Sequence, residues 1–163
     1  MAADGYLKID AMKGESITKG YADGWMEIQS WSWGLSNQPN MSGGGQAAGK
    51  VSFQDLHFTK VVDSTTPPLM QACAQGQHIK KAELHLRKSG NAKEGLTYIK
   101  FLMEEGFITS WNTGGSEGSG IPMEQVSLAF KKFKFDYFPQ KTDGTLGVAI
   151  KAGWDIAKNA SQA

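Results

Sequence analysis

Apolar and polar residues alternate with a period of two over much of the chain. Ala82, Leu84 and Leu86 alternate with charged or polar neighbours, and the segments 99–103 and 126–130 repeat the pattern. On an extended strand this period places the apolar side chains on one face and the polar side chains on the other. The pattern therefore predicts a mainly β fold of antiparallel strands, each with one face in the core and one in water.

The alternation changes phase at three places, between residues 28 and 31, 53 and 56, and 130 and 133. Such a change requires a β-bulge or a strand that leaves one sheet for another. Phase changes within long strands are typical of strongly bent sheets. We therefore expect a small closed or nearly closed antiparallel β-barrel made of two bent sheets.

One segment, TTPPLMQACAQG at 65–76, departs from the strand pattern. Thr66 is the predicted N-cap, Pro67 suits the first helical position, and Gly76 can end a helix. The segment predicts one flanking α-helix over about residues 67–75. Three side chains are expected on the helix face that covers the barrel: Leu69, Met70 and Cys73.

The stretch SWSWG at 30–34 precedes a long segment rich in glycine. On an extended strand Trp31 and Trp33 point to one side, which is most simply the core, and Ser32 points to the other. Residues 35–49 show no regular pattern, so we expect a long extended loop there. In an assembly, the face that carries Ser32 would line a channel or an interface.

The composition is that of a single globular domain over residues 1–163, with 40% hydrophobic and 20% charged residues. The net charge of +1 offers no bulk attraction for nucleic acid or an anionic membrane. One cysteine, Cys73, excludes an internal disulfide and any site built from several cysteines. No stretch has the ~18 apolar residues that span a bilayer, and the N-terminus lacks the apolar core of a signal peptide.

Two short motifs resemble catalytic sequences without their context. GGQAAGK at 44–50 has the spacing of a phosphate-binding loop, but Val51 stands where Ser or Thr would hold magnesium, and a strand follows. GGSEG at 114–118 has the spacing of a nucleophile elbow around Ser116, but more glycine and a proline follow in place of a helix. Both segments are better interpreted as loops.

Asp55 and His57 lie two residues apart on a predicted strand and would share a face. They have no third ligand nearby in the sequence, and Cys73 has no evident base. We therefore expect no catalytic residues, no metal and no cofactor, and a protein that is not an enzyme. A monomeric β-barrel that binds a small ligand or single-stranded nucleic acid is the alternative, and it would show exposed stacking aromatics.

Several segments together resemble the hemolysin-coregulated protein (Hcp) family, the tube subunits of the bacterial type VI secretion system. The most specific is GKVSFQDLHFTKVVD at 49–63. Shorter matches are GES at 14–16, WSWG at 31–34, GGG at 43–45 and GWDI at 153–156. The resemblance covers essentially the whole chain. The chain departs from the family pattern in two segments, ITKGYADG at 17–24 and Glu104-Glu105-Gly106.

The resemblance implies a structural subunit that forms hexameric rings, which stack into a hollow tube. Its implied partners are further copies of itself, a VgrG-like spike protein, a contractile sheath and small effectors in the lumen, with no nucleic acid and no membrane insertion. It implies residence in the bacterial cytoplasm before firing and secretion without a signal peptide.

The resemblance also assigns the loop 35–49 to contacts between subunits or rings. The candidate contact residues are Gln38, Asn40, Met41, Gly43, Gly44 and Gly45. The alternation with the two tryptophans makes Ser32 the candidate for a lumen-facing contact with effectors.

Overall fold

The computed structural model describes residues 3–39, 49–88 and 95–162. Its single helix in these ranges is α1 (Thr66–Gln75). The strands are β1 (Ala3–Ile9), β2 (Met26–Ile28), β3 (Ser30–Ser32), β4 (Leu35–Asn37), β5 (Val51–Phe53), β6 (Leu56–Val61), β7 (Ile79–Lys88), β8 (Leu96–Gly114), β9 (Met123–Tyr137), β10 (Ile150–Asp155) and β11 (Ala160–Ser161). The predicted mainly β fold with one helix is confirmed.

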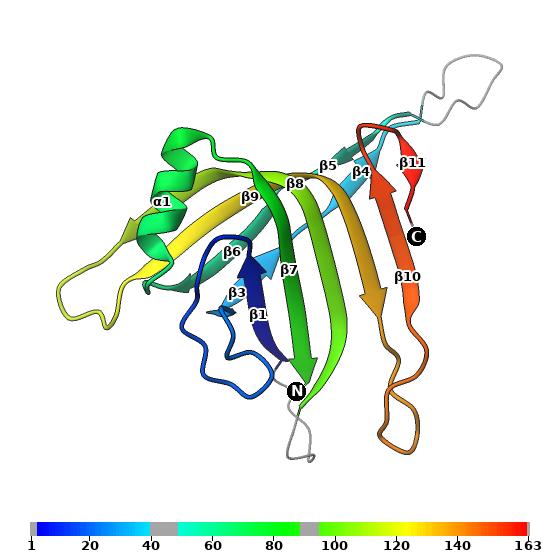
Figure 1. Cartoon of the computed structure of the whole chain (residues 1–163), viewed down its shortest axis with the longest axis horizontal. Helices are drawn as coiled ribbons and strands as arrows, with labels where there is room; N and C mark the ends of the chain where they lie inside the picture. The colour runs from blue at the N-terminus through cyan, green and yellow to red at the C-terminus, as the bar shows by residue number, and fades with distance from the viewer. Residues whose placement is uncertain (1–2, 40–48, 89–94, 163) are drawn as a thin grey trace.

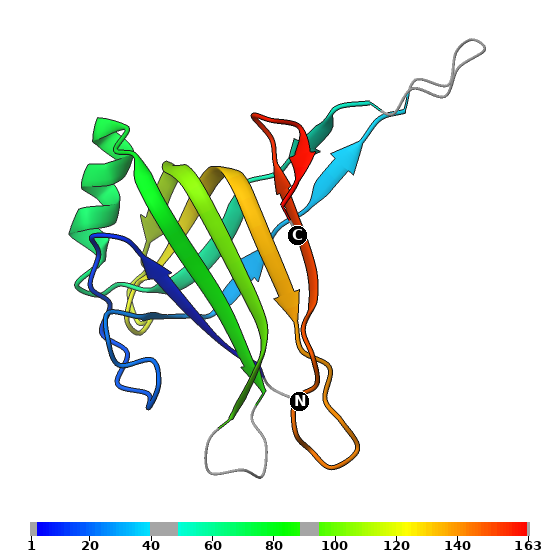
Figure 2. The ribbon, with the colours of Figure 1, turned by 45° about the vertical axis from the view of Figure 1, so that its right-hand side comes forward.

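Most strands belong to one curled antiparallel sheet with the order β11-β10-β9-β8-β7-β1-β2, and β6 joins it by pairing with β9 and β3. Figures 1 and 2 show this sheet wrapping around a central core. The ladder does not close, because β2 pairs only with β1 and β3 only with β6. The chain itself joins β2 to β3 at Gln29, whose N–H donates to the Thr59 carbonyl at 2.7 Å. The sheet is therefore nearly closed and is not a complete barrel.

Each phase change of the sequence coincides with a change of strand partner. The chain passes from β2, paired with β1, to β3, paired with β6, between residues 28 and 31. It passes from β5, paired with β4, to β6 between residues 53 and 56. Along β9, residues 123–128 pair with β6 and residues 132–137 pair with β10. The apolar face changes phase wherever the strand enters a differently oriented part of the sheet.

The change in β9 is mirrored in its neighbour β8. Buried positions in β8 pass from Phe101 and Met103 to Gly106 and Ile108. Between them Glu105 has a φ of 57°, an uncommon conformation for a residue with a side chain. A side chain at Gly106 would place its Cβ 2.4 Å from the Ala129 carbonyl oxygen, so only glycine fits. The Glu-Glu-Gly departure from the family pattern is thus the bend of the two longest strands.

Helix α1 packs against β8 and covers one end of the curled sheet (Figure 1). Its N-cap is Thr65, so the prediction of Thr66 was wrong by one residue, while Gly76 ends the helix at a φ of 61° as predicted. Leu69 and Ala72 are buried, but Met70 is 45% exposed, which corrects its predicted place on the core face. Residues three or four apart share a helix face, whereas Met70 is turned by about 100° from Leu69.

The segment predicted as one loop, 35–49, begins as a strand. β4 pairs with β5 in register, with Leu35 opposite Phe53 and Asn37 opposite Val51. The two strands form a ribbon that projects away from the body of the molecule (Figures 1 and 2). The sequence did not reveal β4, because a three-residue strand depends on a partner that lies beyond the glycine-rich segment.

Candidate functional site

The side of the sheet that faces away from the core carries two rows of polar side chains that cross from β3 to β8. None of them is Asp, Glu, Lys or Arg. One row contains Ser32, His57, Ser127 and Ser110, and the other contains Ser30, Thr59, Gln125 and Asn112. Neighbouring members hydrogen-bond across the strands. His57 Nδ1 lies 2.7 Å from Ser127 Oγ, and Ser110 Oγ donates to Ser127 Oγ at 2.8 Å. We call these eight residues the hydroxyl face.

The hydroxyl face is hollowed into a cavity of about 380 Å³. No Asp, Glu, Lys or Arg is among the described residues that line it. Ser32 lies at its margin and is exposed, as expected from its alternation with the tryptophans. The hollow can therefore offer hydrogen-bond donors and acceptors to a molecule.

The two tryptophans beside Ser32 differ in their surroundings. Trp33 packs against a cluster of phenylalanines, with its ring centre 4.8 Å from that of Phe101 and 5.0 Å from that of Phe133. Trp31 is 36% exposed. The predicted core position is right for Trp33 and only partly right for Trp31, because β3 has a partner strand on one side only.

Of the residues predicted to contact another subunit, Gln38 is described and lies exposed directly after β4. The remaining five, at 40, 41 and 43–45, lie outside the described residues.

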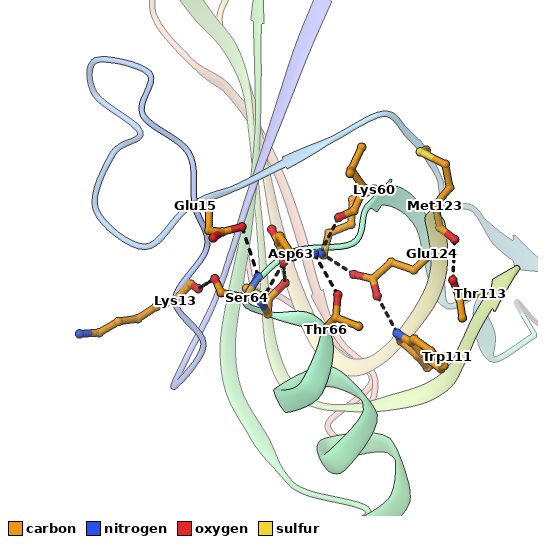
Figure 3. Close-up of polar contacts among 12 residues, drawn as sticks. Lys13, Glu15, Lys60, Asp63, Ser64, Thr66, Trp111, Thr113, Met123 and Glu124 are labelled. Carbon is orange, nitrogen blue, oxygen red and sulfur yellow. Dashed lines mark hydrogen bonds and ion pairs between the residues drawn. The ribbon is translucent and has the colours of Figure 1, made fainter. Parts of the chain in front are cut away.

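A buried charge cluster, which sequence reasoning missed, joins β6 and β9 to the start of α1 (Figure 3). The side chains of Lys60 and Glu124 are fully buried and form an ion pair. The Lys60 ammonium also donates to Asp63 at 2.7 Å, and the Trp111 indole N–H donates to the second oxygen of Glu124 at 2.8 Å. The available signal was that Lys60 stands at an inward position of β6, in phase with Leu56 and Phe58.

Asp63 connects this cluster to the helix cap. It accepts the N–H of Thr65 at 2.8 Å, while its own N–H donates to the Thr66 hydroxyl at 3.1 Å. Burial alone would raise the pKa of Asp63, but hydrogen bonds from Lys60 and Thr65 outweigh burial and hold the pKa below its ordinary value. Asp63 is therefore a carboxylate that fixes the turn between β6 and α1.

Residues 6–137 match the family model described as "Type VI secretion system effector, Hcp". The chain belongs to the Hcp family. It is 43% identical to "Protein hcp1" of Pseudomonas aeruginosa over 161 residues, which is 98% of each chain.

Solved structures agree with this assignment. A structure described as a type six secretion system protein has a TM-score of 0.89 and 28% identity, covering 99% of this chain and 100% of that one. Hcp1 of Salmonella typhimurium has a TM-score of 0.79 and 30% identity, with the same coverage. The fold and the family resemblance inferred from the sequence are thus confirmed.

The residues of the possible catalytic motifs do not form a catalytic site in this Hcp fold. Asp55 accepts a hydrogen bond from Thr109 at 2.6 Å, whereas His57 contacts Ser127, so the two residues have different partners. The Ser116 N–H and carbonyl both bond to the Ser119 hydroxyl within a turn. Gly44 to Ala48 of the phosphate-loop spacing lie outside the described residues, but Val51 does begin a strand.

The described residues also contain no candidate metal centre. No group of three or more His, Cys, Asp or Glu side chains there is placed to hold a metal ion. Within the same ranges, no helix is long and apolar enough to cross a membrane.

Proposed function

We propose that this chain is a structural subunit of the type VI secretion inner tube. In this role it forms hexameric rings that stack into a hollow tube inside a contractile sheath and beneath a VgrG-like spike protein. Sheath contraction then exports the tube from the bacterial cytoplasm. The protein acts without catalysis and without a cofactor. The match to the Hcp family over residues 6–137 carries this proposal.

The hydroxyl face supports the proposal that this surface lines the lumen and that Ser32 contacts carried effectors. Its side chains are largely hydrogen-bonded to one another across the strands, so the face is stable in water without a partner. No Asp, Glu, Lys or Arg is among the described residues that line its hollow. Such a lining suits a channel that passes effectors of different charge, since a strongly charged wall retains one class and repels the other.

The projecting ribbon supports the proposed contacts between subunits or rings through Gln38, Asn40, Met41 and Gly43 to Gly45. Leu35, at the base of the ribbon, is 51% exposed, and Gln38 extends beyond it. An apolar side chain held away from the body of a subunit gains free energy when a neighbour covers it.

The outer strand β10 offers a second surface for assembly. Its residues 150–152 pair with β9 on one side, whereas on the other side β11 and Gln162 cover only Gly153, Trp154 and Asp155. Ile150 is 65% exposed and Val148, just before the strand, is 88% exposed. A sheet edge flanked by exposed apolar side chains is a surface that a neighbouring copy can cover.

Sedimentation velocity over a wide range of protein concentration tests this proposal. A hexamer of this 17.7 kDa chain has a mass of about 106 kDa. We expect this species to dominate at high concentration. A monomer at every concentration would contradict the proposal and favour the monomeric binding module.

A further inference from the structure

A second cavity, of about 440 Å³, lies away from the hydroxyl face, between the segment that follows β1 and the strands β7 and β8. Lys19, Gly20 and Tyr21 form one side of it. These residues belong to the segment ITKGYADG at 17–24.

The lining of this cavity is cationic. Lys19, Arg87 and Lys100 contribute to it, and no Asp or Glu is among its described lining residues. Carboxylates outside the lining also lie near these cations. Asp136 is directly opposite Lys100 in the register of β8 against β9. Asp4 is 4.0 Å from the Arg87 guanidinium, and Glu83 is 3.4 Å from His85 but also 2.6 Å from the Lys81 ammonium.

His85 adds no positive charge to the cavity at neutral pH. Burial lowers the pKa of His85 to about 4, and the nearby Lys100 ammonium acts in the same direction, against the opposing effect of Glu83. The neutral imidazole lies 3.2 Å from the Tyr21 hydroxyl through Nδ1. Tyr21 is held further by a 2.5 Å hydrogen bond to Thr97. This wall of the cavity is therefore fixed and uncharged.

Arg87 is held in place while part of its hydrogen-bonding capacity is unused. Its guanidinium lies over the rings of Tyr6 and Tyr21, at 5.4 Å and 6.0 Å from their centres. Its Nε is buried and has no hydrogen-bond partner among the described residues. A guanidinium fixed by aromatic stacking loses little side-chain entropy when it binds an oxyanion.

The remaining walls are apolar. Trp25, Leu96, Phe138 and Leu146 line the cavity together with its cationic groups. Lys100 lies beside this apolar part, with its Nζ 5.4 Å from the centre of the Phe138 ring. A ligand that pairs with the cationic groups and also contacts the apolar side chains has an anionic group attached to an apolar one. Cavities of a few hundred Å³ with a few convergent polar groups are typical of small-molecule sites.

We propose that this cavity binds a carboxylate attached to an apolar or aromatic group. The carboxylate would lie between Arg87 and Lys100, and the apolar group against Trp25 and Phe138. Two sources present this chemistry: a free small organic acid, and the C-terminal carboxylate of a polypeptide that ends in an apolar residue. The site is independent of the proposed lumen contact at Ser32.

Isothermal titration calorimetry with the whole protein tests the proposal. The probes are phenylacetate and the tripeptide Ala-Ala-Phe with a free C-terminus, and the amide-capped tripeptide is the uncharged counterpart. The test variant is Lys100→Gln, at an exposed position that should not affect folding. The matched control is Lys80→Gln, the same change at an exposed position of β7 outside the cavity lining.

We expect at least one carboxylate probe to bind, and Lys100→Gln to weaken that binding about fivefold, the upper range for one exposed charge. Lys80→Gln should leave it unchanged. Binding of phenylacetate identifies the free acid as a sufficient ligand, whereas binding of the tripeptide alone identifies a chain terminus. The proposal is overturned if neither probe binds at millimolar concentration, if the amide binds equally well, or if the two variants have equal effects.

Discussion

Trp33 is partly buried and packs against the core, whereas Trp31 is 36% exposed. We expect Trp33→Ala to lower the free energy of unfolding by about 3 kcal/mol, the lower end of the range for a fully buried aromatic side chain. Trp31→Ala should cost about 1–2 kcal/mol, because a third of its surface is already in water. Urea unfolding at one fixed protein concentration measures both changes. Equal losses would contradict the difference in packing.

His85 makes the stability of the protein depend on pH. Its pKa is about 4 in the folded chain, against an ordinary value of 6.5. Between pH 4 and pH 6.5 the unfolded chain binds more protons at His85 than the folded chain does. The stability that the neutral His85 contributes is therefore complete above about pH 6.5 and is lost as the pH falls towards 4. We expect the Tm of His85→Gln to fall less than the Tm of the native protein when the pH is lowered from 7 to 4. A larger loss in the variant would show that the imidazole is charged when folded.

Ser32 tests the proposed lumen contact. We expect Ser32→Gln to preserve folding and ring formation, because the side chain is exposed, and to change the affinity for a co-secreted effector by about tenfold. Pull-down or calorimetry with that effector measures the change. Ser116→Gln, at an exposed position in the turn after β8, is the control and should have no effect. If rings fail to form in Ser32→Gln, the serine is packed between subunits and does not face the lumen.

Single residues differ in how far the sequence could place them. The exposure of Ser32 followed from a period of two, which is a local property. The Lys60–Glu124 pair could not be predicted from the sequence. The two residues are distant in the chain and meet only through the register of β6 against β9. A charged residue at an apolar position of the strand indicated that a partner existed, without identifying it.

At the scale of elements, the buried charge cluster joins β6, β9 and α1. We expect Glu124→Gln to lower the free energy of unfolding by about 1–3 kcal/mol, because the fully buried Lys60 ammonium loses one of its two carboxylate partners and keeps only Asp63. The double variant Lys60→Met, Glu124→Leu removes both charges and should be more stable than Glu124→Gln. A double variant at least as unstable as the single would show that the hydrogen bonds lost with Lys60, including the one to Asp63, outweigh the benefit of removing the buried charges.

The strands themselves were predictable where their apolar pattern was regular. Ala82, Leu84 and Leu86 are buried as the alternation requires, and the three phase changes were visible before the structure explained them as changes of partner. A strand beginning at Val51 was expected, but β4 was not predictable, since its three residues carry almost no periodicity. The helix was found from its caps, but its buried face was misassigned at Met70 because two adjacent apolar residues cannot both face the core.

At the scale of the whole molecule, the curled sheet has two surfaces with different roles. Its inner face encloses the core, and part of its outer face is a neutral, internally bonded polar wall. The ribbon and the outer edge of β10 leave apolar side chains exposed at positions that a neighbouring copy could cover. These features together are those expected of a subunit that completes its buried surface by assembly.

Electron microscopy of the purified protein in negative stain tests the central claim most directly. We predict ring-shaped particles with six-fold symmetry and an open central channel, alone or stacked end to end. Particles the size of one 17.7 kDa chain, or assemblies without a channel, would contradict the account of this protein as a tube subunit.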